Sequence, residues 1–252
     1  MNIKSLLQEG SKILKENNIF SHKLDSEILM SKILRKDRKF LILNQSFKLD
    51  EARLKIFKNL IEQRAKGKPV AYLVGSKYFW KYKFNLIENV LIPRPDTELI
   101  IENVLEITKN KSKLRVLDVG IGSGCLLLSI LKEKQDFHGV GIDISKNCIE
   151  LSRSNARNLR LKNRVKFFKT DVDKFNYGKY DLIVSNPPYI KKHKLKYLER
   201  DVIGFEPKLA LNGGLDGLSE IRKVIKKSSE LIKRGGKLVL EIGFDQRNKV
   251  IS

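Results

Sequence analysis

The spacing of apolar residues predicts that the first part of the chain is helical. Over residues 1–75, apolar side chains recur three or four positions apart, with Lys and Glu between them. Ser21 and Asp50 stand where a second and a third helix would begin, and both residue types cap helix N-termini well. Gly67 and Pro69 then end the helical pattern. We therefore expect a small helical N-terminal domain over residues 1–75.

The pattern changes over residues 76–96. Aromatic and β-branched residues dominate the first part of this stretch, and asparagines supply turns, which predicts a β-hairpin. Pro93 and Pro95 then prevent a helix and keep the chain extended. A new helix should begin near Thr97. The segment is thus predicted to be a hairpin and a Pro-rich linker between two domains.

The remainder, residues 97–252, alternates between short apolar runs and helical segments. We expect strands at Arg115–Val119, Gly139–Ile144, Val165–Lys169, Leu182–Ser185 and Lys237–Ile242. Strands that alternate with helices form a parallel sheet covered by helices on both faces. The predicted fold class is therefore α/β, with a doubly wound, mostly parallel sheet and a small helical N-terminal domain.

Composition narrows the classes of function. The chain has 252 residues, and 41% of them are hydrophobic, which excludes a largely disordered protein. No apolar run approaches the roughly 18–20 residues of a membrane span. Two cysteines and three scattered histidines predict neither a disulfide framework nor a metal site. We expect a cytoplasmic monomer that binds no metal.

The net charge is strongly positive, at +22, from 51 Lys and Arg against 29 Asp and Glu. Such a charge favours acidic partners and leaves proximity to RNA or the ribosome open. Most of the basic residues are lysines spread over the whole chain, which indicates a general lysine bias. The densest cluster, at residues 191–196, follows directly on the most informative motif of the sequence.

A glycine-rich loop follows the first predicted strand of the sheet. Glycines in Gly120-Ile121-Gly122-Ser123-Gly124 allow a sharp turn and a close approach of the backbone to a ligand. Asp143 ends the next strand, about 20 residues further on, where an acid reaches ribose hydroxyls in Rossmann-like folds. The Gly-x-Gly-x-Gly spacing favours an adenosyl ligand without a pyrophosphate, such as S-adenosylmethionine.

The fourth predicted strand ends in Asn186-Pro187-Pro188-Tyr189. The two prolines make a rigid, extended exit at the carboxyl edge of the sheet, where ligands bind in open α/β folds. The Asn186 side-chain oxygen and the Pro187 carbonyl could accept both N–H groups of a planar NH2 group, and Tyr189 could stack on it. Asn186, Pro187 and Tyr189 are the catalytic candidates, and Asn186, Pro187, Pro188 and Tyr189 are the substrate-binding candidates. Arg94, Asp96 and Glu241 are further candidates for the rim of this site.

Over almost its whole length the chain resembles the release factor glutamine methyltransferases of the PrmC/HemK type. The segments that carry the resemblance are Gly67–Gly75, Phe79–Trp80, Leu91–Glu98, Phe205–Leu211, Gly213–Leu218 and Glu241–Gln246. The resemblance implies methylation of the side-chain nitrogen (N5) of the glutamine in the Gly-Gly-Gln motif of peptide chain release factors. It also implies that S-adenosylmethionine is the methyl donor and that the helical domain helps to grip the release factor.

The resemblance also assigns residues to the cofactor. The implied cofactor-binding set is Gly120, Ile121, Gly122, Ser123, Gly124, Asp143, Val172 and Asn186. Asn186 would touch both the methionine end of the cofactor and the target amide. Val172 departs from the family pattern, because the residue after Asp171 is often an aromatic that packs on the adenine. The chain also stops soon after the fifth parallel strand, so we expect a sheet without the last strands usual in the family.

Two alternatives remain open from the sequence. An exocyclic-amine methyltransferase acting on nucleic acid would use the same Asn-Pro-Pro-Tyr motif and is favoured by the charge. The second alternative is a truncated, non-catalytic protein that binds release factor or the ribosome. A measurement of cofactor affinity would distinguish it from an enzyme, because such a binder can lack that affinity.

Overall fold

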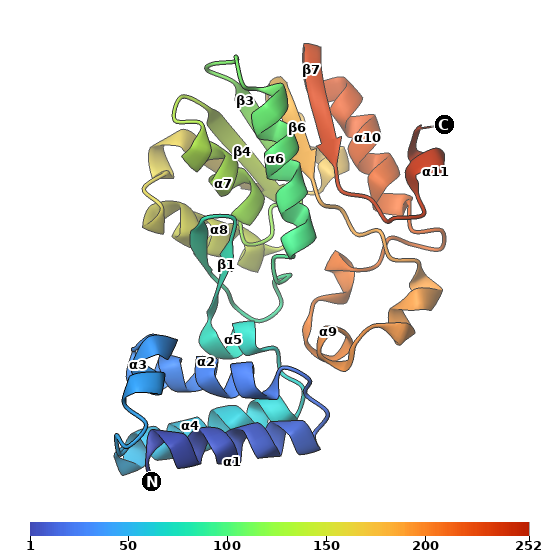
Figure 1. The fold of residues 1–252 in the computed structure, drawn as a ribbon. Helices are drawn as coiled ribbons and strands as arrows, with labels where there is room; N and C mark the ends of the chain where they lie inside the picture. The colour runs from blue at the N-terminus through green and yellow to red at the C-terminus, as the bar shows by residue number, and fades with distance from the viewer. Residues whose placement is uncertain (252) are drawn as a thin grey trace. The chain divides into compact units, whose positions relative to one another are not determined.

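The computed structural model describes residues 1–251, which form two compact units (Figure 1). Unit 1 comprises Met1–Gly75 together with the short segment Glu199–Phe205. Unit 2 comprises Ser76–Leu198 and the chain from Glu206 onward. The chain therefore leaves unit 2 after Leu198, contributes one segment to unit 1, and returns at Glu206.

Unit 1 is helical. Its helices are α1 (Ile3–Glu16), α2 (His22–Leu34), α3 (Arg38–Leu43), α4 (Glu51–Ala65), α5 (Val70–Val74) and α9 (Arg200–Phe205). Asp50 caps α4 as predicted, because its Oδ1 accepts the Arg53 amide at 2.8 Å. Ser21 does precede α2, but its hydroxyl donates to the Asp25 carboxylate and does not cap the helix.

The core of unit 1 is a cluster of buried aliphatic and aromatic side chains from all of its longer helices. Its fully buried members include Ile3, Leu6, Leu14, Leu29, Met30 and Ile61. Gly10 of α1 allows the helices to approach closely, since a Cβ atom there would lie 2.9 Å from atoms of both Ile61 and Ser26.

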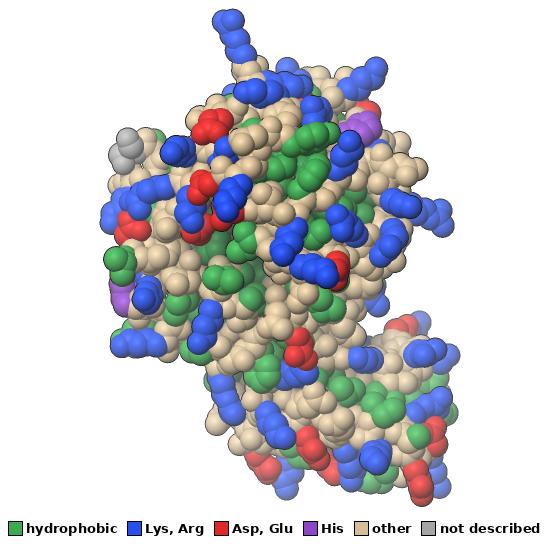
Figure 2. Space-filling model, turned by 180° about the vertical axis from the view of Figure 1, so that it is seen from behind, with side chains coloured by type: hydrophobic (Ala, Val, Ile, Leu, Met, Phe, Trp, Pro, Cys, Tyr) green, Lys and Arg blue, Asp and Glu red, His purple; other side chains and the backbone are tan. Residues whose placement is uncertain are grey.

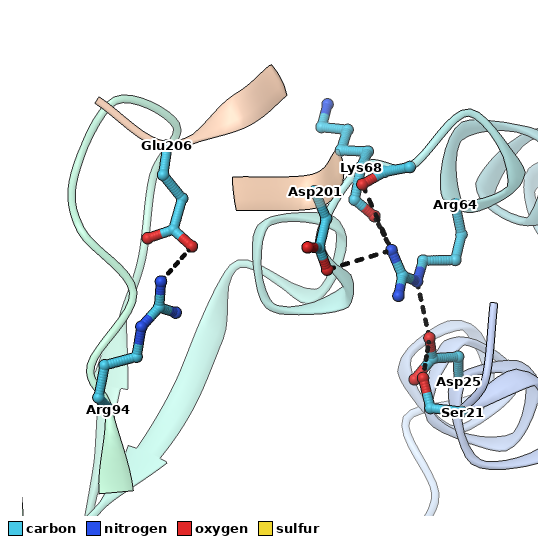
Figure 3. A network of polar contacts seen from close by, with 8 residues as sticks. Ser21, Asp25, Arg64, Lys68, Arg94, Asp201 and Glu206 are labelled. Atoms are coloured by element: carbon cyan, nitrogen blue, oxygen red, sulfur yellow. Dashed lines mark hydrogen bonds and ion pairs between the residues drawn. The ribbon is translucent and has the colours of Figure 1, made fainter. Parts of the chain in front are cut away.

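One buried ion-pair network crosses unit 1 (Figure 3). Arg64 of α4 donates to Asp25 of α2 at 2.7 Å, and the two side chains are only 8% and 3% exposed. The same guanidinium donates to the Gly67 carbonyl and lies 3.9 Å from Asp201 of α9. Arg64 thus joins three elements of this unit, including the segment that arrives from beyond Leu198.

Unit 2 begins with the predicted hairpin, formed by β1 (Ser76–Phe79) and β2 (Tyr82–Asn85) in antiparallel pairing. A short 3-10 helix, η1 (Pro95–Thr97), follows the prolines and leads into α6 (Glu98–Ile107), so the helix start near Thr97 is confirmed. The Trp80 indole donates to Glu133 at 3.0 Å and packs on the core of the unit.

The sheet of unit 2 has the order β5-β4-β3-β6-β7, and all of its pairs are parallel. Its strands are β3 (Arg115–Val119), β4 (His138–Asp143), β5 (Val165–Lys169), β6 (Tyr180–Ser185) and β7 (Ile232–Leu240). The longer helices are α7 (Cys125–Glu133), α8 (Lys146–Asn158) and α10 (Ser219–Leu231), and α11 (Arg247–Ile251) is short. The other 3-10 turns are η2 (Lys162–Arg164), η3 (Val172–Lys174), η4 (Lys192–Tyr197) and η5 (Lys208–Ala210).

Alternate residues of the central strands point to opposite faces, and each face has its own core. Val116 packs with α6, α7 and α8, whereas its neighbour Leu117 packs with α10. This two-faced burial confirms the doubly wound, parallel fold class. The bounds predicted for the last strand differ from the observed ones, since β7 ends at Leu240 and not at Ile242. The Glu241 amide still donates to the Ser185 carbonyl at 3.1 Å.

The side of the molecule shown in Figure 2 carries many basic side chains. Lys and Arg side chains are spread over the side of the molecule that Figure 2 shows, with Asp and Glu side chains among them. Within residues 1–251, no helix has the length and apolar character needed to cross a bilayer.

Candidate functional site

The two sequence motifs meet at the carboxyl edge of the sheet. From β3 the chain proceeds outward through β4 to β5, and then returns to place β6 on the other side of β3. The connections from these two paired strands run in opposite directions along the sheet, so the carboxyl ends of β3 and β6 form the topological switch point. Ligands bind at such points in open α/β sheets. Val119 and Ser185 are paired in the register of the two strands. Gly120 and Asn186, the next residues of each strand, therefore leave the sheet side by side.

The glycine loop after β3 has an accessible backbone. Gly120, Gly122 and Gly124 all have positive φ, at 78°, 54° and 82°. The Gly120 and Ile121 amides both donate to the Ile142 carbonyl at 2.9 Å, which fixes the turn. A Cβ atom added at Gly120 or Gly122 would meet nothing within 4 Å. The loop is thus rigidly held and faces open space on the side where a ligand can approach.

Asp143 at the end of β4 is tied to the same loop. Its Oδ2 accepts the Gly122 amide at 3.0 Å and its Oδ1 accepts the Ser145 amide at 2.9 Å. Burial raises the pKa of this carboxyl, and the backbone N–H groups act in the opposite direction. Each carboxylate oxygen keeps lone pairs for a further donor, such as a ribose hydroxyl.

A second carboxyl, Asp118, lies near the end of β3 and was missed by the sequence analysis. It is buried, and burial raises its pKa to about 7, with the nearby charge of Asp143 adding to the shift. The Leu127 amide donates to it at 3.3 Å and lowers the pKa. The signal in the sequence was an acid inside a buried apolar strand. Asp118 therefore holds its proton to higher pH than an ordinary carboxyl, whereas the backbone N–H groups on Asp143 favour the charged form of that carboxyl.

Asn186 is oriented by a neighbour from η1. Its Nδ2 donates to the buried Thr97 hydroxyl at 2.9 Å. This contact turns the Asn186 Oδ1 away from Thr97. Within the described residues, neither Asn186 Oδ1 nor the carbonyl of the buried Pro187 accepts a hydrogen bond. Both predicted acceptors are therefore free for the N–H groups of a ligand.

Tyr189 is half-buried, and its hydroxyl donates to Glu241 Oε1 at 3.1 Å. Burial, with the charge of Glu241, raises the pKa of Tyr189 to about 12, so the ring carries a neutral hydroxyl. Glu241, a rim candidate from the sequence, thus contacts the motif directly.

Arg94 makes a salt bridge with Glu206 at 2.6 Å (Figure 3). The other Glu206 oxygen accepts the Ile92 amide at 3.2 Å, and the Glu206 side chain is only 2% exposed. Glu206 thereby holds the extended segment that precedes Thr97. Asp96, in contrast, is exposed.

Val172 begins η3, just after β5. Its side chain is 9% exposed and belongs to the apolar cluster that includes Val119 and Ile142, at the ends of β3 and β4. Val172 thus packs with residues at the carboxyl ends of these two strands.

Comparison with known proteins identifies the family of the chain. Residues 5–75 match the family described as PrmC N-terminal domain, and residues 95–203 match the methyltransferase small domain. A release factor glutamine methyltransferase of Clostridium acetobutylicum is 40% identical over 253 residues, which cover 99% of this chain and 89% of that protein. The enzyme of the same description from Clostridium botulinum is 37% identical, over 99% of this chain and 89% of the relative.

A third relative, from Buchnera aphidicola of Acyrthosiphon pisum, has the same description and is 36% identical, over 99% of this chain and 88% of its own length. The matched stretch, at 99% of this chain in each case, spans both units. The chain therefore belongs to the release factor glutamine methyltransferase family and is an S-adenosylmethionine-dependent methyltransferase.

Proposed function

We propose that this protein methylates the side-chain amide nitrogen (N5) of the glutamine in the Gly-Gly-Gln motif of peptide chain release factors. The observation that carries the proposal is the pair of free acceptors, Asn186 Oδ1 and the Pro187 carbonyl, beside the open glycine loop. A primary amide offers two N–H groups to two such acceptors. The relatives that match the whole chain are named for a glutamine in release factors.

The proposed cofactor site is the glycine loop with its flanking residues. Its members are Gly120, Ile121, Gly122, Ser123, Gly124, Asp143, Val172 and Asn186. The open space at Gly120 and Gly122 fits a ligand in contact with the backbone, and Asp143 retains acceptor capacity for the ribose. S-adenosylmethionine supplies a methyl group on a positively charged sulfur, which a carboxylate at the edge of the loop, Asp143, would favour.

The role of the protein in the chemistry is to position the amide. A glutamine nitrogen is a poor nucleophile because its lone pair is delocalised into the carbonyl. When Asn186 and Pro187 accept its two N–H groups, the nitrogen is fixed toward the methyl group and negative charge on the acceptors favours localisation of the lone pair. The Tyr189 ring, whose hydroxyl stays protonated, would pack against the planar amide.

The nitrogen forms its new bond to the methyl carbon while the bond from that carbon to sulfur breaks, and the N–H proton leaves to water afterwards. The reaction needs neither a strong general base nor a metal ion. We also propose that the helical unit contributes to binding of the release factor, and that the protein acts as a monomer in the cytoplasm.

The main alternative is an exocyclic amine of a nucleic acid as the acceptor. The charge of +22 favours it, and so does the lysine cluster after Tyr189. On the side that Figure 2 shows, Asp and Glu side chains lie among the basic ones, and no continuous basic patch is seen there among the described residues.

The experiment that tests the proposal is methyl transfer from labelled S-adenosylmethionine with three acceptors in parallel. These are a purified release factor, the same factor with Asn in place of the Gly-Gly-Gln glutamine, and bulk RNA. We expect label only on the unmodified release factor. Label on RNA would replace the proposal with the nucleic-acid alternative, and label on both release factors would place the methyl group elsewhere. Absence of label, with cofactor affinity also absent, would favour the non-catalytic binder.

A further inference from the structure

Two distant segments hold the backbone that follows Asn186. The first is Leu211–Gly217. The Ile190 amide donates to the Leu211 carbonyl at 3.2 Å, and the Gly213 amide donates back to the Ile190 carbonyl at 2.9 Å. A Cβ atom at Gly217 would lie 2.5 Å from the Tyr189 carbonyl oxygen, so only glycine permits this approach.

The second segment follows β7 and contains Gln246, which is only 2% exposed. Its Nε2 donates to the carbonyl of Tyr189 at 3.0 Å and to that of Gly217 at 3.1 Å. Its Oε1 accepts the Gly243 amide at 2.8 Å. One buried side-chain amide therefore joins the Tyr189 backbone to both of the segments that surround it.

Tyr189 is consequently held at both ends. Gln246 fixes its carbonyl, and Glu241, from the start of the same segment, accepts its hydroxyl at 3.1 Å. Both hydrogen bonds come from the chain after β7, more than fifty residues away in sequence. Holding a residue at its backbone and its hydroxyl restricts where its ring lies, and the fixed φ of the prolines before it carries that restriction toward Pro187 and Asn186.

We propose that Gln246 is a positioning residue for methyl transfer. By anchoring the Tyr189 carbonyl, it sets the place of the Tyr189 ring and of the Pro187 carbonyl that would receive the target amide. This inference rests on the proposed function. Gln246 has no hydrogen bond to the glycine loop or to Asp143, so its effect should fall on the acceptor side of the reaction and not on cofactor binding.

The test is Gln246→Glu. The new side chain has nearly the same shape, and one oxygen can still accept the Gly243 amide. Its other oxygen would face two carbonyl oxygens where an NH2 group stood, so the ionised form repels the Tyr189 carbonyl and the protonated form can donate to only one of the two carbonyls. We expect kcat for methylation of the release factor to fall by about 100-fold, the size of effect that small misplacement of a reacting group produces. The Kd for S-adenosylhomocysteine should stay within about twofold of the wild-type value, because Gln246 makes none of its hydrogen bonds to the glycine loop or to Asp143.

Arg247→Ala is the matched control, because Arg247 is the exposed neighbour of Gln246. It should change neither kcat nor cofactor affinity. If Gln246→Glu does not fold, Gln246→Met carries the same test, since it fills a similar volume and only removes the hydrogen bonds. A folded variant with wild-type kcat would overturn the proposal. A parallel loss of kcat and cofactor affinity would also overturn it, because that pattern indicates general disruption of the site.

A second readout does not depend on activity. In protein labelled with 3-fluorotyrosine, the Tyr189 fluorine signal can be assigned from its absence in Tyr189→Phe. Gln246→Met should shift that signal and leave the signal of the buried Tyr180 in place. If the wild-type protein does not methylate release factor, the proposed function fails, and the fluorine spectrum alone then decides whether Gln246 positions Tyr189. An unmoved Tyr189 signal would refute the positioning role.

Discussion

The Asn186 side-chain amide donates to the Thr97 hydroxyl, with 2.9 Å between Nδ2 and Oγ1. These residues are 89 positions apart, and Thr97 is buried where η1 meets α6. In this structure the contact takes the nitrogen end of the Asn186 amide. With the nitrogen held by Thr97, the oxygen is the end presented to a ligand, as acceptance of a glutamine N–H requires.

Thr97→Val should therefore lower methyl transfer, because the valine cannot accept the Asn186 N–H and the amide can then rotate. We expect kcat to fall by about tenfold to 100-fold, as for the loss of one buried hydrogen bond that orients a reacting group. Thr97→Ser retains the hydroxyl and should keep most of the activity. Steady-state kinetics of the two variants check this, and equal activity in both would contradict the orienting role.

Asp143→Asn should weaken cofactor binding. The Asp143 carboxylate accepts the Gly122 and Ser145 amides, and an asparagine would turn an N–H group against one of them. Hydrogen bonds to charged groups contribute about 1.5–3 kcal/mol, so we expect the Kd for S-adenosylhomocysteine to rise by roughly 10–100-fold. Isothermal titration calorimetry measures it. An unchanged Kd would place the ribose elsewhere.

Asp118 predicts a specific dependence of stability on pH. Its pKa rises from 3.8 in the unfolded chain to about 7 in the folded protein, so the folded protein holds the proton more tightly. Its stabilising contribution is present in full below pH 4 and is lost as the pH rises to about 7. The free energy of unfolding falls by at most about 4 kcal/mol, because each unit of pKa shift corresponds to about 1.36 kcal/mol.

Asp118→Asn should remove this dependence. Urea unfolding of both proteins at pH 5 and pH 8 measures it, and the comparison cancels the contributions of other groups. We expect the wild-type protein to lose more stability than the variant between the two pH values. Parallel changes in the two proteins would show that Asp118 is ionised in the folded state at pH 5.

Arg64→Ala should destabilise the helical unit strongly. It removes one partner of the buried pair with Asp25 and leaves that carboxylate without its cation, which typically costs about 3–5 kcal/mol. Arg38→Ala is the control, because the Arg38–Glu27 pair is exposed and should contribute less than about 1 kcal/mol. Chemical denaturation checks both, and similar losses for the two variants would argue against a special role of the buried pair.

The sequence predicted the features that depend on local patterns. The apolar runs of the strands, the glycine turn at Gly120 and the cap at Asp50 are each encoded within a few residues. Helix α3 was missed because six residues are too short to show a helical period. The end of β7 was misplaced because Ile242 adds a further apolar residue beyond the last residue of the strand, Leu240.

Other features could not be predicted because they join residues distant in sequence. Glu206 pairs with Arg94 across 112 positions, and Gln246 reaches Tyr189 across 57. The segment Glu199–Phe205 packs in the helical unit although its sequence neighbours belong to the other unit. Such partnerships depend on the tertiary fold, and one sequence alone holds no record of them.

The central claim is that the Asn-Pro-Pro-Tyr segment presents a glutamine amide for methylation, and mass spectrometry of the treated release factor tests it most directly. The wild-type protein and Asn186→Ala would each be incubated with release factor and S-adenosylmethionine, and the modified peptide sequenced by fragmentation. The account predicts one methyl group on the side-chain nitrogen of the Gly-Gly-Gln glutamine with the wild-type protein, and none with Asn186→Ala under the same conditions. Undiminished methylation by the variant, or a methyl group on another residue, would contradict it.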